Sequence, residues 1–162
     1  MSAVAYLVWS AEMQIEASIE QTWARAIDYP SWQQFSMVSR RSGAAGKEGE
    51  VMLLKKEEGG VEMPPYYART VKLERMRRIV WKTFPEQRTP AFDFFGFVDF
   101  QFQPHPSGTL FRNNLLYEFN VPDEAAIAAF QQQQATAADV MWRDVFVGRL
   151  KPMLENQLSS RG

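Results

Sequence analysis

The sequence predicts an α+β fold in which an antiparallel sheet has its helices on one side. Three observations support this prediction. Segments that alternate apolar and polar residues follow one another through the middle of the chain, with turn residues between them. The longest such stretch, residues 91–121, forms two strand-like runs around a turn and has phenylalanine on one face. Residues 138–158 instead repeat apolar side chains at helical spacing, so the long helix follows the strands.

The start of the chain predicts one strand and two short helices. Residues 6–16 are apolar and weakly alternating, which is typical of a strand. A Ser-x-x-Gln capping box at residues 18–21 then begins a helix. The Asp-Tyr-Pro-Ser segment at residues 28–31 ends this helix, and a second short helix can continue through Trp32 and Phe35.

The middle of the chain predicts about six antiparallel strands in succession. Gly59-Gly60 supplies a hairpin turn, and residues 74–78 form a charged turn. Pro64-Pro65 excludes a central strand at that point, because proline cannot donate a hydrogen bond to a neighbouring strand. We expect strands after the short helices at residues 37–42, 49–56, 66–73, 79–84, 91–103 and 109–121.

The last forty residues predict helix. Residues 123–138 are rich in alanine and glutamine, which favours helix over strand. Pro152 lies inside the final helical pattern and lacks the N–H that would bond to the carbonyl of Gly148, so we expect a kink there. An apolar stripe runs along this helix at Trp142, Phe146, Leu150 and Met153.

Length and composition indicate one globular domain, residues 1–162. Apolar residues make up 46% of the chain and charged residues 23%, which is ordinary for a globular protein. The net charge of −1 argues against a general nucleic-acid binder, which would carry a basic excess. No apolar run approaches the roughly 20 residues that cross a bilayer.

The chain has no pattern typical of a metal or cofactor site, and we expect neither. It has no cysteine, and no cluster of histidine, aspartate and glutamate has metal-ligand spacing. No glycine-rich loop precedes a helix in the phosphate-binding pattern. The first ten residues lack a basic segment and Glu12 follows soon after, so we expect no secretory signal and a cytoplasmic protein.

Three short motifs, in this order and spacing, resemble the START-like superfamily, also called SRPBCC. This group includes polyketide cyclases and dehydrases and the birch-pollen allergens. Residues 15–23, Ile-Glu-Ala-Ser-Ile-Glu-Gln-Thr-Trp, resemble the first strand and helix start of the family. Residues 28–32, Asp-Tyr-Pro-Ser-Trp, resemble a shortened form of its next turn. Residues 74–81, Glu-Arg-Met-Arg-Arg-Ile-Val-Trp, resemble its charged turn and following strand. The resemblance spans nearly the whole chain.

This resemblance implies a helix-grip fold. A curved antiparallel sheet of about six to seven strands would wrap a long C-terminal helix and leave a cavity between them. Members of the family bind lipids, sterols, polyketides, plant hormones or other apolar molecules, and a minority catalyse ring closure or dehydration. Two features depart from the family pattern. Residues 123–137 are longer than the usual connection to the last helix, and the polar residues proposed for polyketide cyclases have no clear counterpart here.

Alternation along the strands predicts which side chains face the cavity. A one-residue bulge would exchange the two faces of a strand. The same side chains could also fill an ordinary core. The expected ligand-binding residues are Tyr67, Arg69, Val71, Trp81, Phe94, Val98, Phe100, Asn113, Leu115 and Tyr117 from the sheet, Trp142, Phe146 and Leu150 from the helix, and Trp32 and Phe35 near the entrance.

Two of these residues are polar. Arg69 could hold a ligand carboxylate or phenolate, or it could form an internal salt bridge or extend to solvent. Asn113 could contact the ligand or pair with the backbone at a bulge. No catalytic residue is predicted: His105, the single histidine, lies in a Pro-His-Pro turn that we expect at the surface. Tyr67 or Tyr117 could act as a phenolic acid beside Arg69 if the protein were an enzyme.

The function that these observations favour is binding of an apolar small molecule between the sheet and the C-terminal helix, with the kink near Gly148 and Pro152 as the gate. One alternative is a polyketide aromatase/cyclase or dehydratase that uses the same cavity. A second is a non-catalytic partner or lipid-delivery module, which would need an exposed apolar patch such as the alanine-rich residues 123–138. The sequence does not determine the oligomeric state.

Overall fold

The computed structural model describes residues 2–32, 37–55, 57–58, 61–62, 64–90 and 92–155. Phe35, predicted near the cavity entrance, lies outside these residues. Within them, seven strands form one antiparallel sheet in the order β1-β9-β8-β7-β6-β3-β2. The strands are β1 (Ala3–Ile15), β2 (Met37–Ser42), β3 (Val51–Lys55), β6 (Tyr66–Glu74), β7 (Arg78–Pro85), β8 (Phe94–His105) and β9 (Gly108–Val121), with a separate small pair of β4 (Glu57–Glu58) and β5 (Val61–Glu62).

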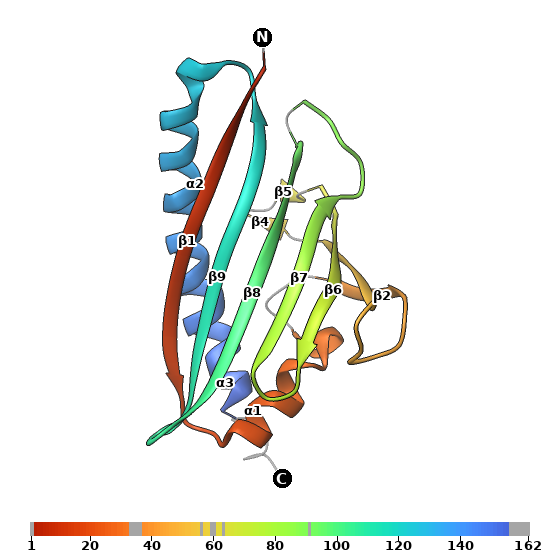
Figure 1. Ribbon diagram of the computed structural model, residues 1–162, viewed down its shortest axis with the longest axis vertical. Helices are drawn as coiled ribbons and strands as arrows, with labels where there is room; N and C mark the ends of the chain where they lie inside the picture. The colour runs from red at the N-terminus through yellow and green to blue at the C-terminus, as the bar shows by residue number, and fades with distance from the viewer. Residues whose placement is uncertain are drawn as a thin grey trace.

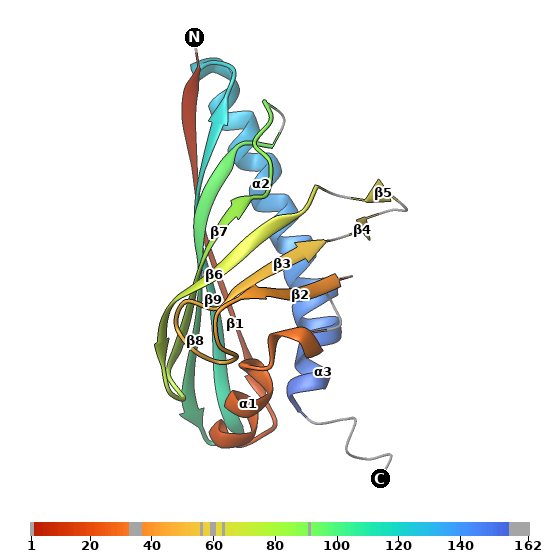
Figure 2. The same cartoon turned by 90° about the vertical axis from the view of Figure 1, so that its right-hand side faces the viewer.

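The helices lie on one side of the curved sheet, which confirms the predicted α+β helix-grip fold (Figures 1 and 2). The long C-terminal helix runs along the sheet beside β1, and the short N-terminal helices lie at the end of the sheet where this helix ends. The helical segments are α1 (Ile19–Ala26), η1 (Tyr29–Ser31), η2 (Glu124–Ala126), α2 (Ile127–Met141), η3 (Trp142–Leu150) and α3 (Lys151–Leu154).

The predicted capping box is present at the start of α1. The hydroxyl of Ser18 accepts a hydrogen bond from the backbone N–H of Gln21 at 3.2 Å, which satisfies one of the free donors of the first turn. The second short helix is one 3₁₀ turn, η1. Trp32 follows this turn and is 1% exposed, so it belongs to the core and not to a cavity entrance as predicted.

A bulge in β6 makes the predicted face of this strand wrong. Thr70 pairs with Trp81 and Lys72 pairs with Val80, so Val71 is the extra residue. Before the bulge the even-numbered residues face the helix, and Ala68 and Thr70 are buried. The odd-numbered residues Tyr67, Arg69 and Val71, which we predicted to face the cavity, therefore lie on the outer face, where Arg69 and Val71 are exposed.

The core is densest where η3 and α3 meet the sheet. Aromatic rings from β7, β8 and β9 pack there against rings from α1, the residues around η1 and η3. The Trp32 ring lies 5.4 Å from the rings of both Trp81 and Phe100, and Phe100 lies 5.7 Å from Phe111. Leu150 is fully buried in the same cluster. This part of the molecule is a filled core, except where Trp81 and Phe100 border a cavity towards α2.

The final helix changes its winding before Pro152. Residues Trp142–Leu150 are π-helical, and the N–H of Lys151 bonds to the carbonyl of Phe146 five residues earlier. A wider turn moves the preceding carbonyls away from the proline ring. Gly148 fits this winding, because a Cβ there would lie 3.3 Å from the carbonyl oxygen of Arg143. The predicted disturbance of the helix thus takes the form of a π-helical stretch immediately before α3.

Candidate functional site

An inner cavity of about 110 Å³ lies between the concave face of the sheet and α2. The sheet contributes most of its lining, and the helix contributes small and flexible side chains. Ala137 and Ala138 leave room here because their side chains end at Cβ. The lining residues are Leu7, Tyr66, Trp81, Thr83, Val98, Phe100, Asn113, Leu115, Tyr117, Gln134, Ala137, Ala138, Met141 and Phe146.

An outer cavity of about 450 Å³ adjoins the inner one. The two cavities have Tyr66, Tyr117, Gln134 and Met141 in common, and we call these four residues the collar. Tyrosines from β6 and β9 thus face two helical side chains at the junction. The remaining lining residues of the outer cavity are Pro64, Pro90, Phe92, Asp93, Phe94, Phe119, Asn120, Val121, Pro122 and Phe130.

Gly96 determines where the ring of Tyr117 lies. The two residues pair directly across β8 and β9. A Cβ on Gly96 would lie 1.6 Å from Cδ1 of Tyr117, so the tyrosine ring occupies the space that a side chain at residue 96 would take. The glycine interrupts the row of phenylalanines on β8, and Tyr117 fills this gap. Residue 96 therefore sets one side of the collar.

Asn113 is a buried polar residue in the wall of the inner cavity. It is 2% exposed, and its Oδ1 receives no hydrogen bond from any described residue. Its inward neighbours along β9 are Phe111 and Leu115, so the amide has apolar surroundings. A buried polar atom without a partner costs roughly 1–3 kcal/mol. Buried polar groups of this kind are commonly satisfied by an ordered water or by a bound ligand.

The two collar tyrosines are neutral phenols. Burial raises the pKa of Tyr66, and the nearby phenol of Tyr117 raises it further. Burial likewise raises the pKa of Tyr117, and a hydrogen bond with the side chain of Thr83 offsets part of this effect. Both hydroxyls therefore keep their protons at neutral pH and can donate hydrogen bonds.

The cavities contain almost no charge. The described lining of the inner cavity includes no aspartate, glutamate, lysine, arginine or histidine. Asp93 in the outer cavity is already paired, with Arg88 at 3.0 Å and with the side-chain amide of Asn120 at 2.8 Å. An ionised ligand group would therefore find no free counter-charge among these residues.

The structure brings together about half of the residues that the sequence predicted. Seven line the inner cavity and Phe94 lines the outer one. Trp142 and Leu150 do not line either cavity: Leu150 is in the filled core, and Trp142 stacks on Phe111 at 6.3 Å and on Phe146 at 5.3 Å. The seven that line the inner cavity are Trp81, Val98, Phe100, Asn113, Leu115, Tyr117 and Phe146.

Sequence reasoning missed the residues that depend on the β6 bulge and on α2. Tyr66 faces inward because the bulge sets the phase of β6. Met141 flanks the apolar stripe of the last helix, and Gln134 and Ala137 belong to the alanine- and glutamine-rich residues 123–138, but none of the three was predicted to line the cavity. Alanines opposite an aromatic sheet are a signal that space remains between the two layers. The partner-module alternative would need an exposed apolar patch, such as one on residues 123–138. Large exposed apolar side chains of the sheet include Tyr6, Val8 and Leu116 on β1 and β9.

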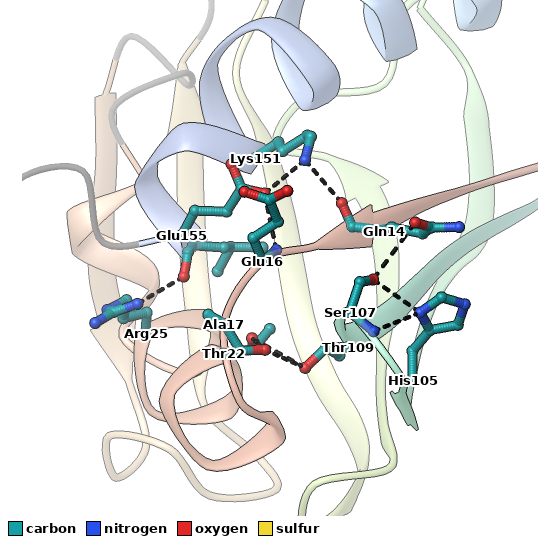
Figure 3. Close-up of polar contacts among 11 residues, drawn as sticks. Gln14, Glu16, Ala17, Thr22, Arg25, His105, Ser107, Thr109, Lys151 and Glu155 are labelled. Carbon is teal, nitrogen blue, oxygen red and sulfur yellow. Dashed lines mark hydrogen bonds and ion pairs between the residues drawn. The ribbon is translucent and has the colours of Figure 1, made fainter.

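Polar contacts fix the C-terminal end of the helix to the sheet and to α1 (Figure 3). Lys151 Nζ donates to the carbonyl of Gln14 at 2.8 Å, and Glu155 accepts from the N–H of Glu16 at 2.8 Å. Arg25 Nη1 donates to the carbonyl of Leu154 at 2.6 Å. We call these contacts the clasp.

The clasp lies at the end of the helix where we predicted a gate. Pro152 lies between Lys151 and Leu154, which both take part in the clasp. The helical residues that line the cavities lie mostly in α2 and not around Gly148 and Pro152. His105 also lies near this end, on the β8–β9 turn, where its Nδ1 contacts the hydroxyl of Ser107 at 2.8 Å (Figure 3).

The charged turn between β6 and β7 is held by an ion pair on the outer face. Arg78 binds Asp99 through two parallel hydrogen bonds of 2.9 Å. This pairing raises the pKa of Arg78. The hollow beside this turn is lined mostly by polar and charged side chains, together with Met76, Phe102 and Pro104, and it shares no residue with the collar.

Comparisons with known proteins identify the fold and leave the function open. No protein-family model matches the chain, and no curated protein matches it. A protein of unknown function from Staphylococcus aureus superposes with a TM-score of 0.70 at 10% identity, covering 98% of each chain. The di-domain ARO/CYC protein StfQ of the steffimycin pathway gives 0.63 at 9% identity, covering 97% of this chain and 51% of StfQ. The Aha1 protein of Colwellia psychrerythraea gives 0.57 at 15% identity, covering 93% and 97%.

These likenesses and the sheet order define the class of fold. The chain has the START-like, SRPBCC-type fold that its motifs resemble. Among the described residues, no group of three or more histidine, aspartate and glutamate side chains could hold a metal ion. Over the same residues, no helix is long and apolar enough to cross a membrane.

Proposed function

We propose that the protein binds an uncharged, largely apolar small molecule in the two adjoining cavities. The observation that supports this most strongly is the inner cavity itself, an aromatic-lined space with one unpartnered amide in its wall. Apolar burial would supply the affinity, at roughly 25 cal/mol per Å² removed from water. The few polar groups would set the orientation.

The cavity volumes suggest how such a ligand would lie. An engineered cavity of about 150 Å³ in another protein binds benzene, so an inner cavity of about 110 Å³ suits one ring or a short chain. The outer cavity of about 450 Å³ falls within the usual range for ligand sites. A ligand with a narrow end in the inner cavity and a larger body beyond the collar would use both.

The test begins with native mass spectrometry of the purified protein, to detect a bound small molecule that denaturation releases. Binding of 1-naphthol is then measured by calorimetry for the wild type and two variants. Ala138→Leu fills the inner cavity, whereas Ala129→Leu changes an exposed position of the same helix. We expect Ala138→Leu to weaken binding at least severalfold and Ala129→Leu to leave it unchanged. Equal binding by all three proteins, or none by the wild type, would contradict the proposal.

A second candidate function is ring closure or dehydration of a polyketide-like chain in the same cavities. Two observations favour it: the fold is shared with an ARO/CYC protein, and two neutral phenols line the same inner cavity as Asn113. Tyr66 and Tyr117 could donate protons to a carbonyl or a leaving hydroxyl. Turnover of a short poly-β-ketone thioester by the wild type, and its loss in Tyr117→Phe with ligand binding retained, would support this function.

A further inference from the structure

We propose that Asn113 determines ligand specificity, by selecting a molecule whose buried end carries an uncharged group that both donates and accepts hydrogen bonds, such as a hydroxyl or a carboxamide. This inference rests on the proposed binding function and gives the ligand a chemical class. It concerns the inner end of the ligand, since Asn113 lines the inner cavity and is absent from the lining of the outer one.

The sheet holds Asn113 firmly in place. The residue lies on β9 between two neighbouring strands, opposite Ala11 of β1 and Phe100 of β8. Its side chain is on the inward face, between Phe111 and Leu115, and is almost completely buried. An amide fixed in this way stays in the cavity wall, because it has no flexible stem that could turn its polar atoms to solvent.

The lack of a partner applies to either orientation of the amide. Oδ1 receives no hydrogen bond from any described residue. If the amide were rotated by half a turn, Nδ2 would occupy the same position as an unpartnered donor. A hydroxyl or a carboxamide satisfies both cases, because each group can donate and accept. A ketone or an ether, which only accept, would satisfy one case.

The surrounding residues disfavour a charged group at this position. Thr83, Tyr66 and Tyr117 are the hydroxyl-bearing residues of the inner lining, and none of them carries charge at neutral pH. Arg69, which could have paired with a carboxylate, lies exposed on the outer face of β6. A carboxylate or an ammonium group would therefore lose its hydration without gaining a counter-ion.

The experiment compares four probes of one shape: 4-butylphenol, 4-butylbenzamide, butylbenzene and 4-butylbenzoate. Calorimetry at pH 7.5 on the wild type should give dissociation constants for the phenol and the benzamide that are roughly tenfold lower than for butylbenzene, which corresponds to one buried hydrogen bond. The benzoate should bind more weakly than all three. Asn113→Leu should remove the preference and retain butylbenzene binding. Asn114→Leu, at the adjacent outward-facing position, should keep the preference.

The possible results separate this inference from the binding function on which it rests. If none of the probes binds the folded wild type, the proposed function fails. If butylbenzene binds as well as the phenol, or if Asn113→Leu keeps the preference, the pocket stands and the role of Asn113 is refuted. Should Asn113→Leu not fold, the side-chain amide resonance of Asn113 decides the matter: it should shift with 4-butylphenol and stay in place with butylbenzene. An unchanged resonance with both would refute the inference.

Discussion

The two ends of the space between sheet and helix are built in opposite ways. At the clasp end, large side chains of α3 and η3 pack into the aromatic core, and Leu150 and Leu154 have no exposed surface. At the α2 end, Ala137 and Ala138 face aromatic residues of the sheet across a cavity. At the clasp end Lys151 and Arg25 donate hydrogen bonds to backbone carbonyls, whereas at the cavity end Oδ1 of Asn113 receives no hydrogen bond from a described residue.

This difference shows that the composition of one helix decides where the fold is solid and where it is hollow. The sheet presents aromatic side chains along its whole concave face. Large helical side chains fill the space beneath one half of it, and alanine leaves space beneath the other. Contacts at the filled end hold the helix against the sheet, and the proposed ligand site lies at the other end. Substitutions at one end should therefore differ from substitutions at the other in their effects on stability and on binding.

The largest effect is expected at the filled end. Phe111 is completely buried among aromatic rings, so Phe111→Ala should lower the free energy of unfolding by about 3–5 kcal/mol. Leu115→Ala, four residues along the same strand, borders a cavity and should cost clearly less. Urea denaturation measures both values. Equal losses would mean that the two ends are packed alike.

A substitution at Gly96 should disturb the cavity end through Tyr117. In Gly96→Ala the new methyl group would collide with the tyrosine ring, which must move out of its place over β8. We expect a loss of roughly 1–3 kcal/mol in stability, typical of an overpacked site, together with weaker 1-naphthol binding. Unchanged binding in this variant would show that the position of the collar does not control the cavities.

Removing the unpartnered amide should stabilise the ligand-free protein, unlike the substitutions above. Asn113→Leu replaces a buried polar group without hydrogen bonds by an apolar one of similar size, so the ligand-free protein should gain roughly 1 kcal/mol. Thermal unfolding monitored by circular dichroism measures this change. A large loss of stability would mean that Asn113 contributes a structural hydrogen bond.

Stability should also fall at high pH because of the collar tyrosines. Burial raises the pKa of Tyr66 and Tyr117 in the folded protein above about 10, the value in the unfolded chain. The unfolded chain therefore releases these protons first, so the stabilisation is complete below pH 10 and is lost as the pH rises above it. Denaturation curves between pH 8 and 11 should show this decrease, and Tyr117→Phe should reduce it. If stability decreased with pH equally steeply in the variant, the decrease could not be assigned to Tyr117.

The smallest effect is expected at the clasp. Lys151 is partly exposed and its contacts with Gln14 and Glu155 are near the surface, so Lys151→Met should cost about 0.5–1 kcal/mol. Binding of 1-naphthol should not change, because the clasp is at the other end of the helix. A strong loss of binding would indicate that the gate lies at the clasp end after all.

The sequence predicted most of the fold because its signals are local. The capping box at Ser18, the alternation of β8 and β9 and the helical stripe at Phe146 each follow from neighbouring residues. The inward face of β9, with Asn113 on it, was predicted correctly for the same reason. Regular spacing is thus sufficient to predict which side chains face inward wherever a strand or helix runs without interruption.

The errors in the predicted site come from features that spacing cannot reveal. Outer residues of β6 include Tyr67 and Val71, so composition favoured the wrong face, and the bulge that sets the phase depends on pairing with β7. The position of the cavity depends on which helical turn meets which strand. Gln134 and Met141 could not be assigned to the collar before that packing was known.

The most direct test of binding in the inner cavity is a crystal structure of the protein with 4-butylphenol at saturating concentration. We predict the ring in the inner cavity, the butyl chain passing the collar towards the outer cavity, and the hydroxyl within hydrogen-bonding distance of the Asn113 amide. A ligand bound elsewhere on the molecule, or an inner cavity that contains only ordered water under these conditions, would show that this cavity is not the ligand site.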